Sequence, residues 1–221
     1  MNATSKFTVP MSHNEHSHIL LAIALTAVAG CVDAIGYLRL RHFFVSFMSG
    51  DSTQLAVSIV RGDWAHAATA GAIVALFLAG VVAGRSMSTT LDSWGRPTVL
   101  ATEALLLAVA GVTAASTVIA LSLATVAMGV QNAALDKERS ARMGLSYITG
   151  TLVSLGDKLA DALCSHRGDR WAWVPHLLHW GALVLGAVCG AVSYEAWGLS
   201  ALLAPAIAAA ALAAVTVKAR A

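Results

Sequence analysis

Charged side chains are scarce in this 221-residue chain, at 12% against about 25% in an ordinary soluble domain. Hydrophobic residues make up 57% of the sequence. A water-facing surface cannot be built from so few charges, so the composition excludes a soluble globular protein. The net charge is only +2 and the basic residues do not cluster, which excludes a nucleic-acid partner as well.

Sequence motifs for catalysis and cofactor binding are also missing. The chain has no G-x-S-x-G, H-E-x-x-H or G-x-x-x-x-G-K-[ST] sequence. Its three cysteines have none of the close spacings typical of metal or redox sites, and we assign them to packing. We therefore expect no enzyme activity, no cofactor and no metal site.

Long apolar runs are what the chain does contain. They are close to the roughly 18 to 20 residues that a helix needs to cross a bilayer, and they occupy residues 19–38, 67–83, 99–115, 118–135, 177–192 and 199–217. These runs predict an all-α, polytopic helical membrane protein with about six transmembrane helices. The polar residues 1–18 are expected to form a disordered cytoplasmic tail, and residues 218–221 a short basic one.

Two halves of the sequence are copies of one another. Gly30-Cys31-Val32-Asp33-Ala34 matches Gly129-Val130-Gln131-Asn132-Ala133. Asp33 then aligns with Asn132 at an offset of 99 residues, and Gly50 with Gly150 at an offset of 100. Further along, Gly80 and Gly84 match Gly186 and Gly190, which predicts close helix crossings at these small-xxx-small faces. We divide the membrane region into two repeats, 19–116 and 117–217.

Two further segments, 43–60 and 143–163, resist assignment as simple spans, because polar residues and a glycine interrupt each of them. If both crossed the membrane, the 14 Lys and Arg residues would divide seven to seven between its two sides. If both re-enter, three lie outside and eleven inside, as the bias of cytoplasmic loops toward basic residues requires. We therefore expect six spans, two glycine-broken re-entrant segments and cytoplasmic termini in the bacterial inner membrane. Three spans per half is an odd number, so the repeats are expected to be inverted.

The re-entrant segments supply the candidate binding site. Each would carry a short helix beginning near Asp51 or Thr151, and the two N-terminal ends would face each other near the membrane midplane. Free N–H groups at such ends favour anions or polar solute oxygens, and the Ser, Thr and Asp residues there are of the types that cap helix starts. The candidate solute-binding residues are Asp33, Ser49, Gly50, Asp51, Gln54, Gln131, Asn132, Thr149, Gly150 and Thr151.

Asp33 has two interpretations. An acid deep in a span costs about 2.5 to 3.5 kcal/mol on insertion scales when ionised, so it usually faces a cavity or a partner. It is either a proton or cation site, with Asp51 as a second acid, or a buried carboxyl that locks the halves together through Asn132.

Other polar residues within apolar runs have alternatives of the same kind. The two interpretations given for Asp33 apply also to Glu103, which lies at a shallower depth in its predicted span. The amides of Gln131 and Asn132 fit helix packing at least as well as solute contact. His176 and His179 fit an interfacial belt with the neighbouring tryptophans better than a proton relay.

The motifs also resemble a known family, the YoaK-like family of small multi-spanning bacterial membrane proteins. The matching residues are Gly30-x-x-Asp33-Ala34-x-x-Tyr37-Leu38, Phe44, Ser49-Gly50-Asp51, Gly129-x-Gln131-Asn132-Ala133 and Tyr147-x-Thr149-Gly150-Thr151-Leu152-x-x-Leu155. The resemblance implies the fold and a membrane location, and no established activity. The family pattern reads Thr-Gly-Asn at the first break, so Asp51 replaces a neutral amide in this chain.

We expect an inner-membrane transporter or channel for an unknown small solute or ion, with its polar site between the two repeats. A non-transporting scaffold, sensor or assembly factor is the alternative, and an intramembrane enzyme using Asp33 and Asp51 is a third. The expected partners are the lipid bilayer and the solute, and a homo-oligomer is compatible with the sequence.

Overall fold

The computed structural model describes residues 13–40, 42–134, 148–164 and 170–218. All regular structure in this part of the chain is helical, without a strand. In chain order the elements are α1 (His13–Leu40), α2 (Met48–Arg61), α3 (Trp64–Thr90), η1 (Asp92–Trp94), α4 (Gly95–Val112), α5 (Thr117–Gln131), α7 (Ile148–Cys164), α8 (Val174–Trp197), η2 (Gly198–Leu202) and α9 (Leu203–Lys218).

Four stretches are long and apolar enough to cross a membrane: His18–Leu40, Trp64–Thr90, Asp92–Val112 and Val174–Lys218. The last has 45 residues, about twice what one crossing needs, and η2 divides it into α8 and α9. Helix α5 is apolar but has only 15 residues. The prediction of an all-α, polytopic helical membrane protein is confirmed.

The ends of the chain lie mostly outside the described residues. Helix α1 already begins at His13, within the stretch 1–18 for which we predicted a disordered tail. Residues 1–12 and 219–221, which carry the rest of the two predicted tails, are not among the described ones.

The predicted breaks at Ser49-Gly50-Asp51 and Thr149-Gly150-Thr151 are wrong in their position. Helix α2 begins at Met48 and α7 at Ile148, and both continue through these motifs without interruption. Hydroxyl groups are satisfied inside α2, because Ser52 Oγ donates to Met48 O at 2.7 Å and Thr53 Oγ1 to Ser49 O at 3.0 Å. The irregular backbone lies just before α2, at residues 42–47.

The predicted capping role of the polar residues in α2 is also wrong. Phe47 occupies the N-cap position of this helix, and no side chain caps it. Helix α2 is capped at its C-terminal end, where Gly62 adopts a left-handed conformation with φ 70°.

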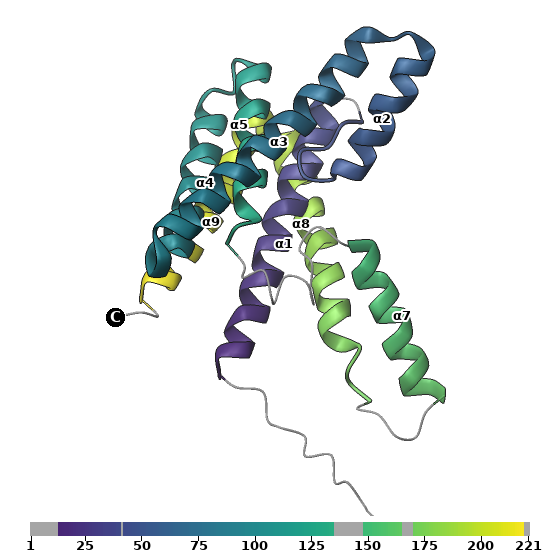
Figure 1. Cartoon of the computed structure of the whole chain (residues 1–221), viewed down its shortest axis with the longest axis vertical. Helices are drawn as coiled ribbons and strands as arrows, with labels where there is room; N and C mark the ends of the chain where they lie inside the picture. Colours follow the sequence, from purple (N-terminus) through teal and green to yellow (C-terminus); the bar gives the residue numbers. More distant parts are fainter. Residues whose placement is uncertain (1–12, 41, 135–147, 165–169, 219–221) are drawn as a thin grey trace, which may run out of the picture.

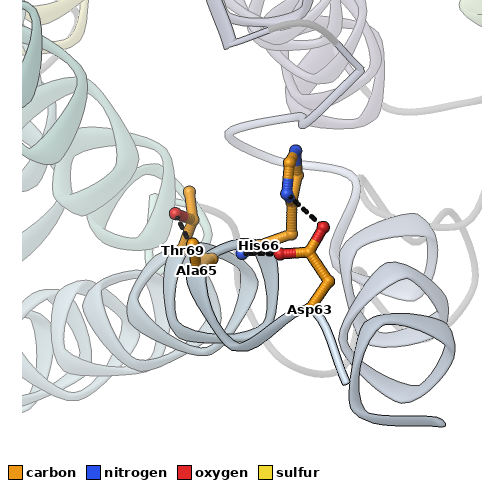
Figure 2. A network of polar contacts seen from close by, with 4 residues as sticks. All are labelled: Asp63, Ala65, His66 and Thr69. Carbon is orange, nitrogen blue, oxygen red and sulfur yellow. Dashed lines mark hydrogen bonds and ion pairs between the residues drawn. The ribbon is translucent and has the colours of Figure 1, made fainter. Parts of the chain in front are cut away.

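Asp63 then caps α3 directly after this turn. Its side chain accepts a hydrogen bond from the backbone N–H of His66 at 3.2 Å and lies 2.7 Å from His66 Nδ1. Figure 2 shows both contacts, together with the Thr69 hydroxyl that donates to Ala65 O one turn further on. This turn makes α2 and α3 a helical hairpin.

Close backbone contact joins α1 to α8. A Cβ atom on Gly30 would collide with the carbonyl oxygen of Leu183. Cβ atoms on Gly186 and Gly190 would collide in the same way with carbonyl oxygens of α1, those of Ala27 and Cys31. Only glycine lets the two backbones approach this closely.

The contact between α3 and α5 repeats this arrangement residue by residue. Gly129 packs on the carbonyl of Phe77, and Gly80 and Gly84 pack on those of Val126 and Val130. The α5 residues differ from their α1 counterparts by 99 positions, and the α3 residues from their α8 counterparts by 106. A helix of each half therefore packs on a helix of the other half.

The remaining helices extend the same arrangement. Helix α2 packs on α3 as α7 packs on α8, and α4 packs on α9. Figure 1 shows α2 and α7 on one side of the bundle, at opposite ends of it. In the same view α1 and α4 run toward the end at which α2 lies, whereas α5 and α9 run away from it. The main apolar core lies between α1, α4, α5, η2 and α9.

Substitution of two glycines in α8 should have different effects on stability. We expect Gly186→Ala to lower the free energy of unfolding by about 1–3 kcal/mol, because its methyl group meets fixed backbone of α1. Gly181→Ala is the matched control, because a Cβ at Gly181 meets nothing within 4 Å, and it should be neutral or stabilising by about 0.5–1 kcal/mol. Unfolding of the purified protein in detergent measures both. Equal effects of the two changes would contradict the close crossing.

Candidate functional site

Asp33 lies in the last third of α1 and holds the irregular backbone that precedes α2. Its Oδ1 accepts hydrogen bonds from the backbone N–H groups of Val45 at 2.9 Å and Ser46 at 2.7 Å. Its Oδ2 accepts a third from the Ser46 hydroxyl at 2.5 Å. The carboxyl therefore fixes the entry into α2 to α1.

Asp51 holds the same loop from the other side. Its side chain is fully buried, and its Oδ1 accepts a hydrogen bond from the backbone N–H of Phe44 at 3.1 Å. Its Oδ2 has no hydrogen-bond partner among the described residues. Two acids that are 18 positions apart in sequence thus hold the three consecutive residues 44–46.

A cavity of about 770 Å³ opens beside this loop. Its walls come from α1, α8, the loop before α2 and the first residues of α7. Phe47, which precedes α2, lines it together with Ile148 and Thr149 at the start of α7, so both short helices begin at this cavity. The sequence predicted that these two N-terminal ends face each other near the membrane midplane, and the structure brings both to one cavity.

Most of the predicted binding residues lie elsewhere. Of the ten, only Asp33 and Thr149 line the cavity. Gln54 instead donates to the carbonyl of His42 at 3.2 Å. Ser49, Gly50, Asp51, Gly150 and Thr151 belong to the first turns of α2 and α7 without lining the cavity.

Gln131 and Asn132 form a separate polar group at the end of α5, and the structure does not bring Asn132 to Asp33. Gln131 Nε2 donates to the carbonyl of Leu25 in α1 and to Glu103 Oε1 in α4, both at 3.0 Å. Asn132 Nδ2 donates to Met128 O at 2.8 Å within its own turn. The backbone that follows Asn132, residues 135–147, lies outside the described part of the chain.

Two further polar side chains, those of Glu103 and His179, are buried among the helices. Glu103 is fully buried at the contact of α1, α4 and α5, and within the described residues its Oε2 has no partner. His179 is 5% exposed and its Nε2 lies 3.1 Å from Thr26 Oγ1, so its side chain is buried between α8 and α1. The sequence feature that could have predicted the contact of His179 with α1 is the set of glycines in α1 and α8, because these glycines bring the two helices together.

Three aromatic rings at the cavity were not predicted as binding residues. Tyr37 and Phe44 have centroids 5.1 Å apart, and Phe44 and Phe47 have centroids 5.3 Å apart in an edge-on arrangement. All three line the cavity. Their sequence signal was weak, since Tyr37 lies on a helix and the phenylalanines on an irregular loop.

Comparison with known proteins assigns the chain to a family. Residues 21–215 match the family described as "Protein of unknown function (DUF1275)". The chain belongs to this family. It is 31% identical over 192 residues to the UPF0700 transmembrane protein RA0705 of Rhizobium meliloti (strain 1021), covering 86% of this chain and 82% of that one. It is 29% identical over 163 residues to the UPF0700 transmembrane protein YoaK of Bacillus subtilis (strain 168), covering 69% and 72%.

These relatives confirm the resemblance to the YoaK-like family and establish an integral membrane protein. No solved structure matches the chain. The matched region contains the cavity-lining residues of all four contributing segments. In the described part of the chain, no group of three or more His, Cys, Asp or Glu side chains could hold a metal ion.

Replacement of Asp33 should show how much the loop depends on it. Asp33→Leu leaves the N–H groups of Val45 and Ser46 without an acceptor, and each unpaired buried group costs about 1–3 kcal/mol. We expect a loss of at least about 2 kcal/mol in unfolding free energy. Asp33→Asn keeps a carbonyl oxygen for both donors and should lose clearly less. An Asp33→Leu protein as stable as the wild type would contradict this role.

Proposed function

We propose that the protein is a transporter or channel for a small solute of the bacterial inner membrane, and that the cavity beside Asp33 is its binding site. The observation that carries the proposal is the convergence on one cavity of the starts of both short helices, α2 and α7. The cavity volume of about 770 Å³ suits a small organic molecule.

We further propose that the two repeats are inverted. The glycine contacts of α1 with α8 recur between α5 and α3 at constant offsets, and equivalent helices run in opposite directions in Figure 1. In transporters built from inverted repeats, the substrate site lies between the repeats and near the bilayer midplane, beside interrupted helices. The cavity takes its lining from both halves, since α1 belongs to the first and α7 and α8 to the second.

The orientation that we propose puts both termini in the cytoplasm. The first residues of α1 and the last residues of α9 lie at the same end of the molecule in Figure 1, which an even number of crossings requires. Helix α2 then re-enters from outside and α7 from the cytoplasm. The proposal includes no chemical reaction and no cofactor.

A scaffold or assembly factor is the second candidate, and one observation favours it. Asp33 accepts three hydrogen bonds from residues 45 and 46. A residue whose role is only to hold the start of α2 against α1 would make the same contacts. The two candidates differ in whether a solute enters the cavity.

Narrowing the cavity should stop solute movement. We expect proteoliposomes to take up at least one solute from a panel of neutral, cationic and anionic small molecules faster than empty liposomes do, as measured by osmotic swelling. Thr149→Trp places a large ring at the cavity wall and should reduce this uptake to the rate of empty liposomes. Thr53→Trp is the matched control, because Thr53 is an exposed residue of α2 that does not line the cavity.

The outcomes separate the two candidates. Uptake that is equal in the wild type and Thr149→Trp would show that the cavity is not the path. No uptake of any solute by the wild-type protein would overturn transport and leave the scaffold.

The orientation is tested at Cys164, the exposed last residue of α7. In a variant with Cys31→Ala and Cys189→Ala, Cys164 should resist a membrane-impermeant maleimide in spheroplasts and react once the membrane is opened. A variant without native cysteines but with Arg61→Cys, at the end of α2, should react in intact spheroplasts. Labelling of Cys164 from outside would reverse the proposed orientation.

A further inference from the structure

We propose that the cavity beside Asp33 binds a monovalent organic cation with an apolar body, such as a quaternary ammonium ion or a protonated alkylamine. This inference rests on the proposed function, because it concerns the same cavity and names the chemical class of its solute. Charge, aromatic rings and apolar walls each support it.

Asp33 is the sole charged residue among those that line the cavity in the described part of the chain. All three groups that donate to it are neutral, two backbone N–H groups and one hydroxyl. Such donors suit an ionised carboxylate, which only accepts, and they occupy three of its roughly four lone-pair positions. No Lys, Arg or His in the described residues forms an ion pair with it. Among the described residues, the Asp33 carboxyl thus faces the cavity without a cationic partner.

Asp51 is a second acid near the cavity, and it contacts the same loop without lining the cavity. It is fully buried, and it contacts the backbone of Phe44 with one oxygen while the other has no partner among the described residues. The loop that carries two of the aromatic rings is therefore held between two acids. Among the described residues of this wall, an anionic solute would meet no compensating positive side chain.

The three aromatic rings provide the second support. Tyr37, Phe44 and Phe47 form a continuous row, with neighbouring centroids 5.1 and 5.3 Å apart. The phenol of Tyr37 is fixed by His42 Nδ1 at 2.8 Å. Ring faces attract cations within about 6 Å, and groups of aromatic rings bind quaternary ammonium ions in this way. A carboxylate beside such a row is suited to an alkylated ammonium group.

The rest of the cavity selects against small inorganic cations. The α8 wall is apolar and includes Leu183, Val184 and Val188. Hard metal cations need six or more oxygen ligands, or several retained waters, which this wall does not supply. An alkyl or aryl group attached to the ammonium would lie against it and lose its contact with water.

Binding of simple probes tests the inference. The probes are benzyltrimethylammonium, choline, 3,3-dimethylbutan-1-ol, which is a neutral isostere of choline, and benzoate as an anion. Calorimetry and thermal unfolding in a non-ionic detergent should show binding in the order benzyltrimethylammonium, choline, then the neutral alcohol, with none for benzoate. Equal binding of choline and its neutral isostere would overturn the inference.

Two variants connect the binding to named side chains. Asp33→Asn should abolish the preference for choline over the neutral alcohol, whereas Asp63→Asn should keep it, because Asp63 caps α3 outside the cavity and Asn caps equally well. Phe47→Leu should weaken benzyltrimethylammonium binding by roughly 2- to 30-fold while retaining an apolar side chain. Because Phe47 is exposed on the loop, this variant tests the site even if Asp33→Asn does not fold. Unchanged affinity in Phe47→Leu would overturn the aromatic contribution.

Proteoliposomes separate this inference from transport itself. Uptake of neutral solutes without binding of the ammonium probes would support transport and overturn the cation site. Binding of the ammonium probes without uptake of any solute would support the cation site and overturn transport.

Discussion

Backbone-to-backbone contact at glycine is the constraint on which the rest of this structure depends. Lipid tails are as apolar as leucine, so helices in a bilayer gain little from burying apolar side chains against each other and associate through close packing instead. Here six glycines bring α1 against α8 and α3 against α5. These two contacts place the starts of α2 and α7, which pack on α3 and α8, beside a single cavity.

The polar residues divide according to how their hydrogen-bonding capacity is used. Gln131 joins α1, α4 and α5 by donating to Leu25 O and Glu103, and His179 joins α8 to Thr26 of α1. Asp33 differs from these, since it fixes irregular backbone and also faces open space. Irregular backbone needs hydrogen-bond partners from elsewhere in the protein, and the loop before α2 finds them in Asp33 and Asp51.

Much of this arrangement could be predicted from the sequence. The duplicated glycines predicted two close helix crossings without naming the partner helices, and the position of Asp33 in an apolar run predicted that it faces either a cavity or a partner. The position of the helix starts could not be predicted, because Ser and Thr side chains can bond to carbonyls one turn back as readily as they cap a helix. Alignment of Asp33 with Asn132 suggested a contact between them, yet equivalent positions in two repeats need not touch. The aromatic row depends on how an irregular loop folds, and no periodic pattern encodes that.

The exchange of partners between the halves has a consequence for their independence. Each of the six glycine contacts between α1 and α8 and between α3 and α5 joins a helix before residue 113 to one after residue 116, where the short connection from α4 to α5 lies. Neither half on its own could cover its glycine faces, so an isolated half would be complete only when a second copy supplied them. The two halves of the chain therefore resemble two subunits of a dimer joined by a four-residue linker. Because the linker keeps the halves together, their association does not depend on protein concentration and is not lost on dilution.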